Sequence, residues 1–409
     1  MRRLVVVGAS LAGLRAAQAA RKAGFDGDLV MIGDERHRPY TRPPLSKELL
    51  AGEHAVDSVH LPSDELGVEW RLGVRAVSLD RGRRRVVLAD GDDVQYDRVI
   101  LATGSRPRRW PGAGAELAGV HVLRSFDDAL ALRAAFDERP RVAIVGAGFI
   151  GCEVAQTARK EDLDVTLIDI AATPMLPLGP ELGEWCAQLH RERGVDVRLG
   201  TGVAGLVGDG RVEAVELAGG ERVPADVVVV GLGALPNIEW LGASGLEVES
   251  GLACDATLTA AGDPDILGAG DIVAWPHRLA DGEPIRIEHW TVAAEQGQLA
   301  GRNALLAPDE RKPYVTPPYF WTDQYDVKIQ SLGLPGRAEQ VELLECTPDR
   351  ARMVYGGERD GRLVGIIAIN AARRLGSYRM VLEDPPGFDE LRATVAADPG
   401  ALGIPVGAT

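Results

Sequence analysis

The sequence predicts an α/β protein in which one strand, glycine turn and helix pattern occurs twice and is followed by a smaller α+β region. Residues 5–17 read VVVGASLAGLRAA and residues 141–155 read RVAIVGAGFIGCEVA, so the two copies are internal repeats. Residues 327–370 hold short alternating apolar segments separated by turns, as in an antiparallel sheet. At 409 residues, with roughly 100 to 200 residues per domain, we expect about three domains.

The composition is that of a globular protein, with 45% hydrophobic and 26% charged residues. A formal net charge of −15 argues against binding to nucleic acid or to an anionic membrane, because both would be repelled. The four cysteines are far apart and include no C-x-x-C pair. This excludes a zinc site with the usual cysteine spacing and a redox-active pair of neighbouring cysteines. No apolar run approaches the roughly 20 residues of a membrane span. We therefore expect a cytoplasmic protein with no metal site.

The first copy begins with the apolar strand at residues 5–7 and continues into Gly8, Ser10 and Gly13, spaced as G-x-G-x-x-G with serine in the middle. In such a turn the first glycine permits the tight bend, the middle one lets the backbone approach a pyrophosphate, and the last allows close helix packing. The segment DLVMIGDE then ends in Asp34 and Glu35, which supply the acidic group expected about 20 residues later for a ribose. Ser10 weakens this copy, but the context still predicts a nucleotide site.

The second copy is complete, since the strand Val142 to Val145 leads into Gly146, Gly148 and Gly151. The segment DVTLIDI places Asp169 at the end of the next strand. A single glycine turn is often an ordinary strand-to-helix connection, whereas two with acidic ends predict two Rossmann-like dinucleotide-binding domains. No arginine or lysine lies near Asp169, in IAATPML, so a free 2′-hydroxyl is favoured over a 2′-phosphate and NADH over NADPH.

Crossover segments set the domain bounds. YDRVILATGSRPRRWPG at residues 96–112 and ADVVVVGLGALPN at residues 225–237 each run from a strand into a glycine turn and proline. We predict a discontinuous first dinucleotide-binding domain at 1–109 and 236–314, a second at 110–235, and a C-terminal α+β domain at 315–409. The last domain should contain the strands VKIQSLG, QVELLE, ARMVYGGE and RLVGIIAIN, then the helix FDELRATVAAD.

Five motifs occur in the same order as in the flavoproteins with two dinucleotide-binding domains that are related to glutathione reductase, and the chain resembles that superfamily. The motifs are GASLAG, ATGSRP, GAGFIG, GLGALPN and GAGD. Within that superfamily, YTRPPLSK at residues 40–47 and YFWTDQYDVKIQSLG at residues 319–333 resemble the bacterial ferredoxin reductases of the putidaredoxin reductase and rhodocoxin reductase type. The resemblance covers nearly the whole chain, and the last two motifs are the specific ones.

The resemblance implies FAD in the first domain and the nicotinamide dinucleotide, NADH, in the second. The FAD pyrophosphate would lie at Gly8, Ser10 and Gly13, and Asp34 or Glu35 would contact the ribose. Further cofactor contacts implied by the family are Arg42, Lys47, Ala76, Thr103, Gly104, Arg124, Gly233, Asp271, Trp290 and Trp321. Trp321 is equally well interpreted as a core aromatic residue.

The reaction requires the nicotinamide close to the flavin, and the cofactors carry the chemistry themselves. By resemblance, Lys47 approaches the flavin N5 edge and pairs with Glu153, while Glu288 contacts the nicotinamide amide. Without this resemblance, the expectation for Lys47 and Glu153 would be two solvated surface residues, since lysine and glutamate are mostly exposed.

The implied activity is NADH:ferredoxin oxidoreduction, in which single electrons pass to a [2Fe-2S] ferredoxin that supplies a cytochrome monooxygenase or a ring-hydroxylating oxygenase. Disulfide reductases of the same fold need a cysteine pair that YTRPPLSKELL lacks. Two alternatives stay open: a rubredoxin reductase, and an NADH-sensing flavoprotein of the apoptosis-inducing-factor type. We expect a monomer or a weak dimer.

Ferredoxins are usually acidic, so docking on this acidic chain requires a local basic patch. Arg373 and Arg374 in NAARRLGSYR are the candidates, ahead of Arg302 and Arg379. A solvated arginine pair without a docking role is the alternative interpretation.

Overall fold

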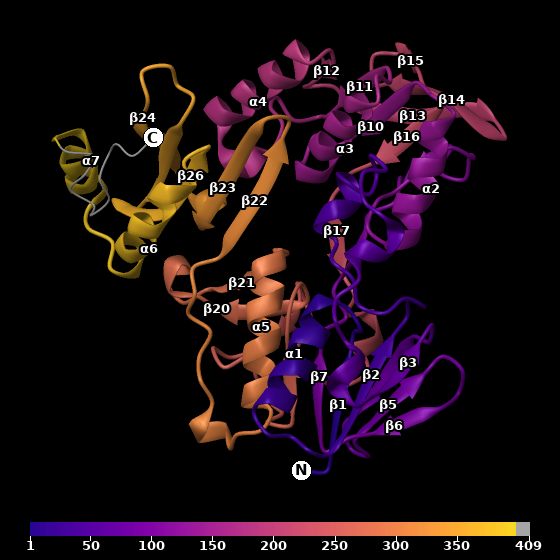
Figure 1. Cartoon of the computed structure of the whole chain (residues 1–409), viewed down its shortest axis with the longest axis vertical. Coiled ribbons are helices and arrows are strands. Elements are labelled where there is room, and N and C mark those ends of the chain that lie inside the picture. The colour runs from indigo at the N-terminus through magenta and orange to yellow at the C-terminus, as the bar shows by residue number, and fades with distance from the viewer. Residues whose placement is uncertain (398–409) are drawn as a thin grey trace. The chain divides into compact units, whose positions relative to one another are not determined.

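The structure is a computed structural model of the chain, and it describes residues 1–397 (Figure 1). The chain folds into two units, each assembled from segments that are far apart in sequence. Unit 1 comprises Met1–Thr41, Asp57–Arg106 and Leu235–Pro318, and unit 2 comprises Arg42–Val56, Pro107–Ala234 and the residues from Tyr319 onward.

Unit 1 is built on a five-stranded parallel sheet in the order β19-β7-β1-β2-β3. Its strands β1, β2 and β7 are buried along most of their length, which is why they read as continuous apolar runs. Helices α1 and α5 pack together at two glycines of α5: a Cβ on Gly297 would lie 2.3 Å from the Ala12 carbonyl oxygen, and one on Gly301 would lie 2.2 Å from that of Ala16. The bounds are β1 Arg3–Val7, α1 Leu11–Lys22, β2 Asp28–Gly33, β3 Val68–Leu72, β7 Arg98–Leu101, β19 Ile266–Gly268 and α5 Trp290–Asn303.

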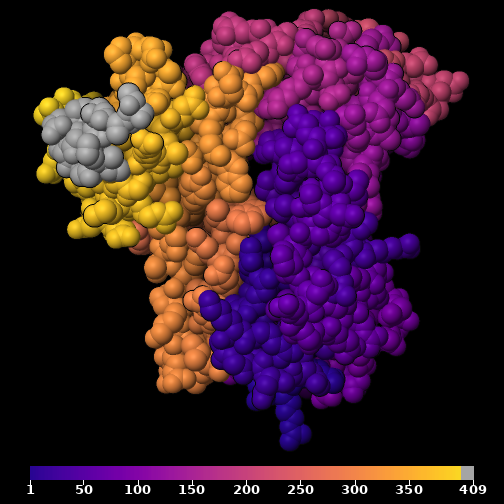
Figure 2. Space-filling model, in the orientation of Figure 1, coloured from indigo at the N-terminus to yellow at the C-terminus, as the bar shows by residue number. Residues whose placement is uncertain are grey.

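Two smaller three-stranded sheets complete unit 1. One is antiparallel and consists of β4 Ala76–Asp80, β5 Arg85–Leu88 and β6 Asp93–Gln95. The other contains β18 Leu252–Ala253, β20 Val273–Pro276 and β21 Pro284–Arg286. Short 3-10 helices include η5 Glu239–Leu241, which packs against β4. The first residues project from the surface of this unit (indigo, Figure 2), and Met1 is exposed.

Unit 2 contains a second parallel sheet, in the order β12-β11-β10-β16-β9. Strands β10 and β16 are fully buried valine-rich segments. Helix α2 begins with a capping box, in which Ser125 accepts from the backbone N–H of Asp128 and Asp128 accepts from that of Ser125. The bounds are β9 Val120–His121, α2 Phe126–Asp137, β10 Val142–Val145, α3 Phe149–Lys160, β11 Val165–Ile168, α4 Pro180–Glu192, β12 Asp196–Arg198, β13 Val203–Asp209, β14 Arg211–Leu217, β15 Arg222–Pro224 and β16 Val227–Val230.

The C-terminal part of unit 2 is a five-stranded antiparallel sheet in the order β22-β23-β26-β25-β24, accompanied by two helices. Buried residues of β23, β25 and β26 join the core that α3 and β10 also form, which places this sheet and the second parallel sheet in one unit. The bounds are β22 Tyr319–Gln324, β23 Val327–Gly333, β24 Gln340–Cys346, β25 Met353–Arg359, β26 Arg362–Ile369, α6 Leu375–Glu383 and α7 Phe388–Ala397.

Two short strands accompany the chain where it passes between the units: β8 Ser105–Pro107 and β17 Ala234–Pro236 pair with each other. Every helix within residues 1–397 is too short or too polar to cross a membrane.

The predicted fold class is confirmed, with two parallel dinucleotide-binding sheets and a C-terminal antiparallel sheet. The observed units differ from the predicted bounds in two ways. The segment Arg42–Val56 belongs to unit 2, although its neighbours on both sides belong to unit 1, and the second sheet shares its unit with the C-terminal sheet. The division into three functional domains stays a prediction.

Candidate functional site

The first glycine turn joins β1 to α1 and has no room for side chains at its two glycines. Gly8 has a φ of +121°, and a Cβ there would lie 2.0 Å from the Ala102 carbonyl oxygen. A Cβ on Gly13 would lie 1.9 Å from the Gly8 carbonyl oxygen. Ser10 sits at the N-cap of α1 with extended backbone, at φ −119°, which any residue adopts. The serine in the middle of the pattern is therefore compatible with the turn.

The second turn joins β10 to α3 and repeats this geometry. Gly146 has a φ of +112°, with a Cβ position 2.3 Å from the Gly231 carbonyl oxygen, and the Cβ position of Gly151 is 2.0 Å from the Gly146 carbonyl oxygen. At Gly148, by contrast, a Cβ would meet no atom of residues 1–397 within 4 Å. The fold itself therefore does not require glycine at this middle position, and the space beside it is open to a ligand.

The predicted carboxylates lie at the ends of the strands that follow. Asp169 accepts hydrogen bonds from the backbone N–H groups of Ala147, at 2.6 Å, and Ala171, at 2.8 Å. It thereby fixes the second glycine turn, and a carboxylate has further lone pairs for a ribose hydroxyl. In unit 1, Glu35 accepts from the Tyr40 hydroxyl, while Asp34 lines a cavity.

This cavity has a volume of about 480 Å³ and lies entirely within unit 1, at the carboxyl ends of β1 and β2. Ligands of parallel α/β sheets bind at this edge. Four of the predicted FAD residues line it, namely Gly8, Asp34, Ala76 and Thr103. The complete lining is Val7, Gly8, Ile32, Gly33, Asp34, Val74, Arg75, Ala76, Val77, Thr103, Arg106, Asn237, Glu239 and Trp240.

Another wall of the cavity is formed by Arg106, Glu239 and Trp240, which were not predicted from the sequence. Arg106 pairs with Glu239 at 2.5 Å and donates to the Pro236 carbonyl oxygen at 3.2 Å. Trp240 follows on the same short helix η5. The sequence signals for this wall are two family motifs: Arg106 lies in ATGSRP, and Glu239 and Trp240 follow shortly after GLGALPN.

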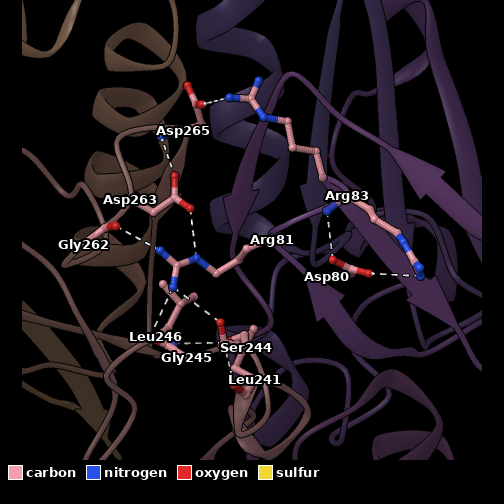
Figure 3. Close-up of polar contacts among 11 residues, drawn as sticks. Asp80, Arg81, Arg83, Leu241, Ser244, Gly245, Leu246, Gly262, Asp263 and Asp265 are labelled. Carbon is pink, nitrogen blue, oxygen red and sulfur yellow. Dashed lines mark hydrogen bonds and ion pairs between the residues drawn. The ribbon is translucent and has the colours of Figure 1, made fainter.

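Arg81, at the turn after β4, ties this wall to the antiparallel sheet (Figure 3). Its guanidinium pairs with Asp263 at 2.9 Å and donates to the carbonyl oxygens of Ser244, Gly245 and Gly262 at 3.4, 3.2 and 2.9 Å. Ser244 in turn donates to the Leu241 carbonyl oxygen at the end of η5. The Arg81 side chain therefore connects the end of β4 with the segment that follows η5.

A second group of predicted residues in unit 1 surrounds Asp271 at the end of β19. The Asp271 carboxylate accepts from the Ser105 hydroxyl at 2.8 Å, and its carbonyl oxygen accepts from Arg286 at 3.0 Å. Arg286 also pairs with Glu288 at 2.5 Å, so the predicted nicotinamide contact is held by an arginine. Burial lowers the pKa of the neighbouring His289 to about 4, which keeps this imidazole neutral at pH 7 and excludes it as a charged group there.

The other predicted residues of unit 1 are also ordered. The indole N–H of Trp290, the first residue of α5, donates to the Thr41 hydroxyl at 3.2 Å. Thr103 donates to the Asn237 carbonyl oxygen at 2.7 Å, and Gly104 accepts from the Asn237 backbone N–H at 2.9 Å. The ATGSRP and GLGALPN motifs therefore meet directly.

In unit 2 the predicted pairing of Lys47 with Glu153 is confirmed. Their charged atoms are 3.0 Å apart, and the side chains are 11% and 6% exposed. Two hydroxyls complete the shell of the Glu153 carboxylate: Ser46 donates at 2.5 Å and Thr322, from β22, at 2.6 Å. Asp323 lies 3.9 Å from the Lys47 ammonium. A buried ion pair of this kind persists only with such hydrogen bonds, since desolvation is costly.

The remaining predicted residues of unit 2 lie nearby in sequence or space. Arg42 donates to the Arg124 carbonyl oxygen at 2.6 Å, so these two are in contact. Trp321 stacks on Tyr319 with ring centroids 6.0 Å apart. Gly233 has a φ of +84°, and a Cβ there would meet no described residue within 4 Å.

The proposed docking arginines differ from each other. Arg374 pairs with Glu345 at 2.8 Å, both side chains being 12% exposed, and the Tyr378 hydroxyl donates to the same carboxylate. Its charge is paired inside the unit, so the alternative interpretation, a solvated arginine pair, is wrong for Arg374. Arg373 lies beside it on η9, Ala372–Arg374.

Both glycine turns fit a dinucleotide, because each leads into a helix N-terminus and is followed by a carboxylate at the next strand end, and in the second turn the middle position is open. Residues 2–297 match the family model described as pyridine nucleotide-disulphide oxidoreductase, and residues 319–401 match the one described as reductase C-terminal.

Individual relatives cover nearly the whole chain. The chain is 39% identical over 387 residues to the anthranilate 1,2-dioxygenase system ferredoxin--NAD(+) reductase component of Burkholderia cepacia, covering 92% of this chain and 93% of the relative. It is 35% identical to rhodocoxin reductase of Rhodococcus erythropolis, covering 93% and 89%. A chain of the crystal structure of the covalent putidaredoxin reductase-putidaredoxin complex superimposes with a TM-score of 0.89 at 30% identity, covering 97% of this chain and 98% of that one. The chain belongs to the pyridine nucleotide-disulphide oxidoreductase family, and within it to the ferredoxin reductases, as the sequence resemblance predicts.

Proposed function

We propose that this protein is an FAD-containing, NADH-dependent ferredoxin reductase of an oxygenase system. The net reaction converts NADH and two oxidised ferredoxins into NAD⁺, a proton and two reduced ferredoxins. FAD, when bound, takes two electrons from NADH as hydride and releases them singly. The observation that carries the proposal is the combination of two glycine turns with a buried Lys47–Glu153 pair in a chain with no cysteine before Cys152. Without a cysteine pair near the flavin, electrons do not leave through a disulfide.

The residues of unit 1 are assigned to FAD. The Gly8 turn and the N-terminus of α1 hold its pyrophosphate, and Asp34 and Ala76 on the cavity wall hold its adenosine part. The Asp271 and Trp290 region is assigned to the flavin end by the family resemblance.

The residues of unit 2 are assigned to NADH. The Gly146 turn and the N-terminus of α3 receive the pyrophosphate, and Asp169 accepts from a ribose hydroxyl. A 2′-phosphate would be repelled by this carboxylate, so we expect preference for NADH over NADPH. Glu288 of unit 1, held by Arg286, is the proposed contact of the nicotinamide amide.

The Lys47–Glu153 pair is assigned to the N5 edge of the flavin by resemblance. Glu153 holds the Lys47 side chain in place, because both of its oxygens accept hydrogen bonds from the surrounding shell. The ammonium group then supplies a fixed positive charge and a donor where negative charge develops during reduction.

The electron acceptor is proposed to be a [2Fe-2S] ferredoxin, in line with the similar proteins named above. Because the chain carries a net charge of −15, a local basic surface must attract an acidic partner. Arg373 stays a candidate for it, whereas the paired Arg374 is less suited. The free cysteines of the described chain are typical of a cytoplasmic protein, and a monomer or weak dimer is expected.

The proposal is tested by anaerobic titration of the purified holoprotein with NADH and, separately, NADPH, while the visible flavin absorption is followed. A [2Fe-2S] ferredoxin is then added. We expect bleaching by NADH and flavin reoxidation as the ferredoxin is reduced.

Each other outcome contradicts part of the proposal. Bleaching without transfer to the ferredoxin, but with transfer to rubredoxin, would identify a rubredoxin reductase. A long-lived reduced protein that changes oligomeric state and transfers to neither would identify a sensor of the apoptosis-inducing-factor type. A protein that binds no flavin would refute the assignment of the first glycine turn.

A further inference from the structure

Strand β22, the first of the C-terminal sheet, carries two fully buried polar side chains. Thr322 and Gln324 are both 0% exposed, and because they lie two positions apart on a strand, their side chains leave the same face. The strand packs against helix α3, which carries Glu153. A buried polar group is costly unless it is hydrogen-bonded, so the bonds of these two side chains show what they serve.

The distances fix the direction of the hydrogen bonds. Oε1 of Glu153 lies 3.0 Å from the Lys47 ammonium and 2.6 Å from the Thr322 hydroxyl. A carboxylate can only accept, so the single hydroxyl hydrogen of Thr322 points to Glu153. The Thr322 oxygen lies 2.9 Å from the Gln324 amide and must then accept, which requires the NH₂ group of Gln324 on this side. Gln324 therefore leaves the Thr322 hydroxyl one role, that of a donor to the carboxylate.

The two side chains act on the carboxylate oxygen that also holds Lys47. Lys47 and Thr322 both donate to Oε1 of Glu153. The Ser46 hydroxyl donates to the other oxygen, Oε2, at 2.5 Å. Without the Thr322 donor, Oε1 would keep only the ammonium group, and that group lies 3.9 Å from a second carboxylate, Asp323. The resting position of the ammonium between these two carboxylates therefore depends on the donor that Thr322 contributes.

We infer that Thr322 and Gln324 are positioning residues of the reductase reaction. Gln324 directs the Thr322 hydroxyl, and this hydroxyl sets the place of the Lys47 ammonium through the shared carboxylate. The inference rests on the proposed function, in which the ammonium supplies a positive charge at the N5 edge of the flavin. Neither residue needs to touch a cofactor, because a charge stabilises a reacting group most effectively when its position is fixed beforehand. Strand β22 thereby becomes a determinant of the reduction step.

The test combines two measurements on the purified holoprotein: the two-electron reduction potential of the bound flavin, and stopped-flow reduction of the flavin at increasing NADH concentration. Thr322→Val keeps the shape of the side chain and removes the donor. We expect the limiting rate of reduction to fall roughly tenfold, as for the loss of one hydrogen bond to a charged group, while the Kd of NADH stays within about twofold of the wild-type value. The equilibrium for reduction should also shift roughly tenfold towards the oxidised flavin, which is about 30 mV for two electrons.

Companion variants test the order of the two residues. Thr322→Ser restores the hydroxyl and should recover both the limiting rate and the potential. Gln324→Met removes the donor that orients Thr322, and we expect changes in the same direction but smaller, roughly threefold. Adding Gln324→Met to Thr322→Val should cause no further loss, because Gln324 acts only through the hydroxyl. The double variant also removes the unpaired amide that Thr322→Val leaves buried, so it keeps the test possible if the single variant folds poorly.

Thr259→Val is the matched control, because this buried threonine of unit 1 loses an equivalent hydroxyl, which accepts from Arg311 at 2.7 Å. It should lower the melting temperature without changing the flavin potential or the limiting rate. Wild-type values in Thr322→Val, a Thr322→Ser variant as impaired as Thr322→Val, or an equal loss of rate in Thr259→Val would each overturn the positioning role. A wild-type protein whose flavin is not reduced by NADH would instead refute the proposed function, so the two failures are distinguishable.

Discussion

At Gly148, the middle glycine of the second turn, a substitution can test ligand binding without disturbing the fold. In Gly148→Ala the new methyl group enters open space, because no atom of residues 1–397 lies within 4 Å of the Cβ position. Backbone strain is also absent, since Gly148 has φ −74° and ψ −176°. Gly151→Ala is the matched opposite, with its Cβ position 2.0 Å from the Gly146 carbonyl oxygen.

The expected magnitudes follow from these distances. Gly148→Ala should leave the free energy of unfolding unchanged or raise it by about 0.4 to 1 kcal/mol, because alanine restricts the unfolded chain. The methyl group would, however, occupy the space into which the NADH pyrophosphate must come, at a cost of about 1 to 3 kcal/mol, or roughly 5- to 150-fold in Kd. Gly151→Ala should lower the free energy of unfolding by about 3 kcal/mol or more, since a backbone oxygen cannot move aside cheaply.

Denaturant unfolding of each variant measures stability, and stopped-flow reduction of the flavin at increasing NADH concentration measures the Kd. The reasoning is refuted if Gly148→Ala binds NADH like the wild type, because the pyrophosphate would then lie elsewhere. It also fails if Gly148→Ala unfolds as easily as Gly151→Ala. Ser10→Gly in the first turn is the companion variant and should change FAD affinity without affecting the Kd of NADH.

Three more predictions follow from individual side chains. Asp169→Asn should weaken NADH binding and reduce the preference for NADH over NADPH, which the ratio of the two kcat/KM values measures. The same substitution should lower the free energy of unfolding by about 1 to 3 kcal/mol, because the carboxylate accepts from two backbone N–H groups. A melting curve checks this second effect. Burial lowers the pKa of His190 to about 4, so the unfolded chain takes up this proton first as the pH falls below 6.5, and the free energy of unfolding should decrease by about 2 kcal/mol from this residue between pH 7.5 and pH 5. His190→Gln should remove that part of the pH dependence in unfolding curves at the two pH values, and an unchanged slope would contradict the assignment. Arg374→Met should lower the free energy of unfolding by about 3 to 5 kcal/mol, because Glu345 loses its ion-pair partner. Arg373→Glu should leave the free energy of unfolding unchanged but raise the KM for ferredoxin and alter the salt dependence of that KM. If Arg373→Glu lowered stability and Arg374→Met changed only the KM, the two assignments would be wrong.

Some features could be predicted because they depend on short stretches of chain. The glycine turns follow from backbone demands at Gly8, Gly13, Gly146 and Gly151, where the structure leaves no space for a side chain. The alternating segments near the C-terminus became β23 to β26 within a residue or two, since their patterns repeat with the period of a strand. Strand β22 and helix α6 were not anticipated, because their sequences lack a clear period.

The Lys47–Glu153 pair is an intermediate case. Composition and spacing alone favour two exposed residues, and only the family resemblance pointed to their contact. The buried pair depends on Ser46 and Thr322, which are 107 and 169 positions away from Glu153. No local pattern encodes partners at such separations.

The sequence by itself therefore determined the fold class, the two nucleotide turns and the acidic strand ends, since each is a local requirement of backbone and charge. Only the tertiary structure decided which distant residues form the rest of the unit 1 cavity, where Trp240 joins the lining and Arg81 reaches Asp263 across 182 positions. It also decided that Arg374 is paired with Glu345. The physical reason is the same in each case: whether a charge or a donor is satisfied depends on groups that folding brings together from distant parts of the chain.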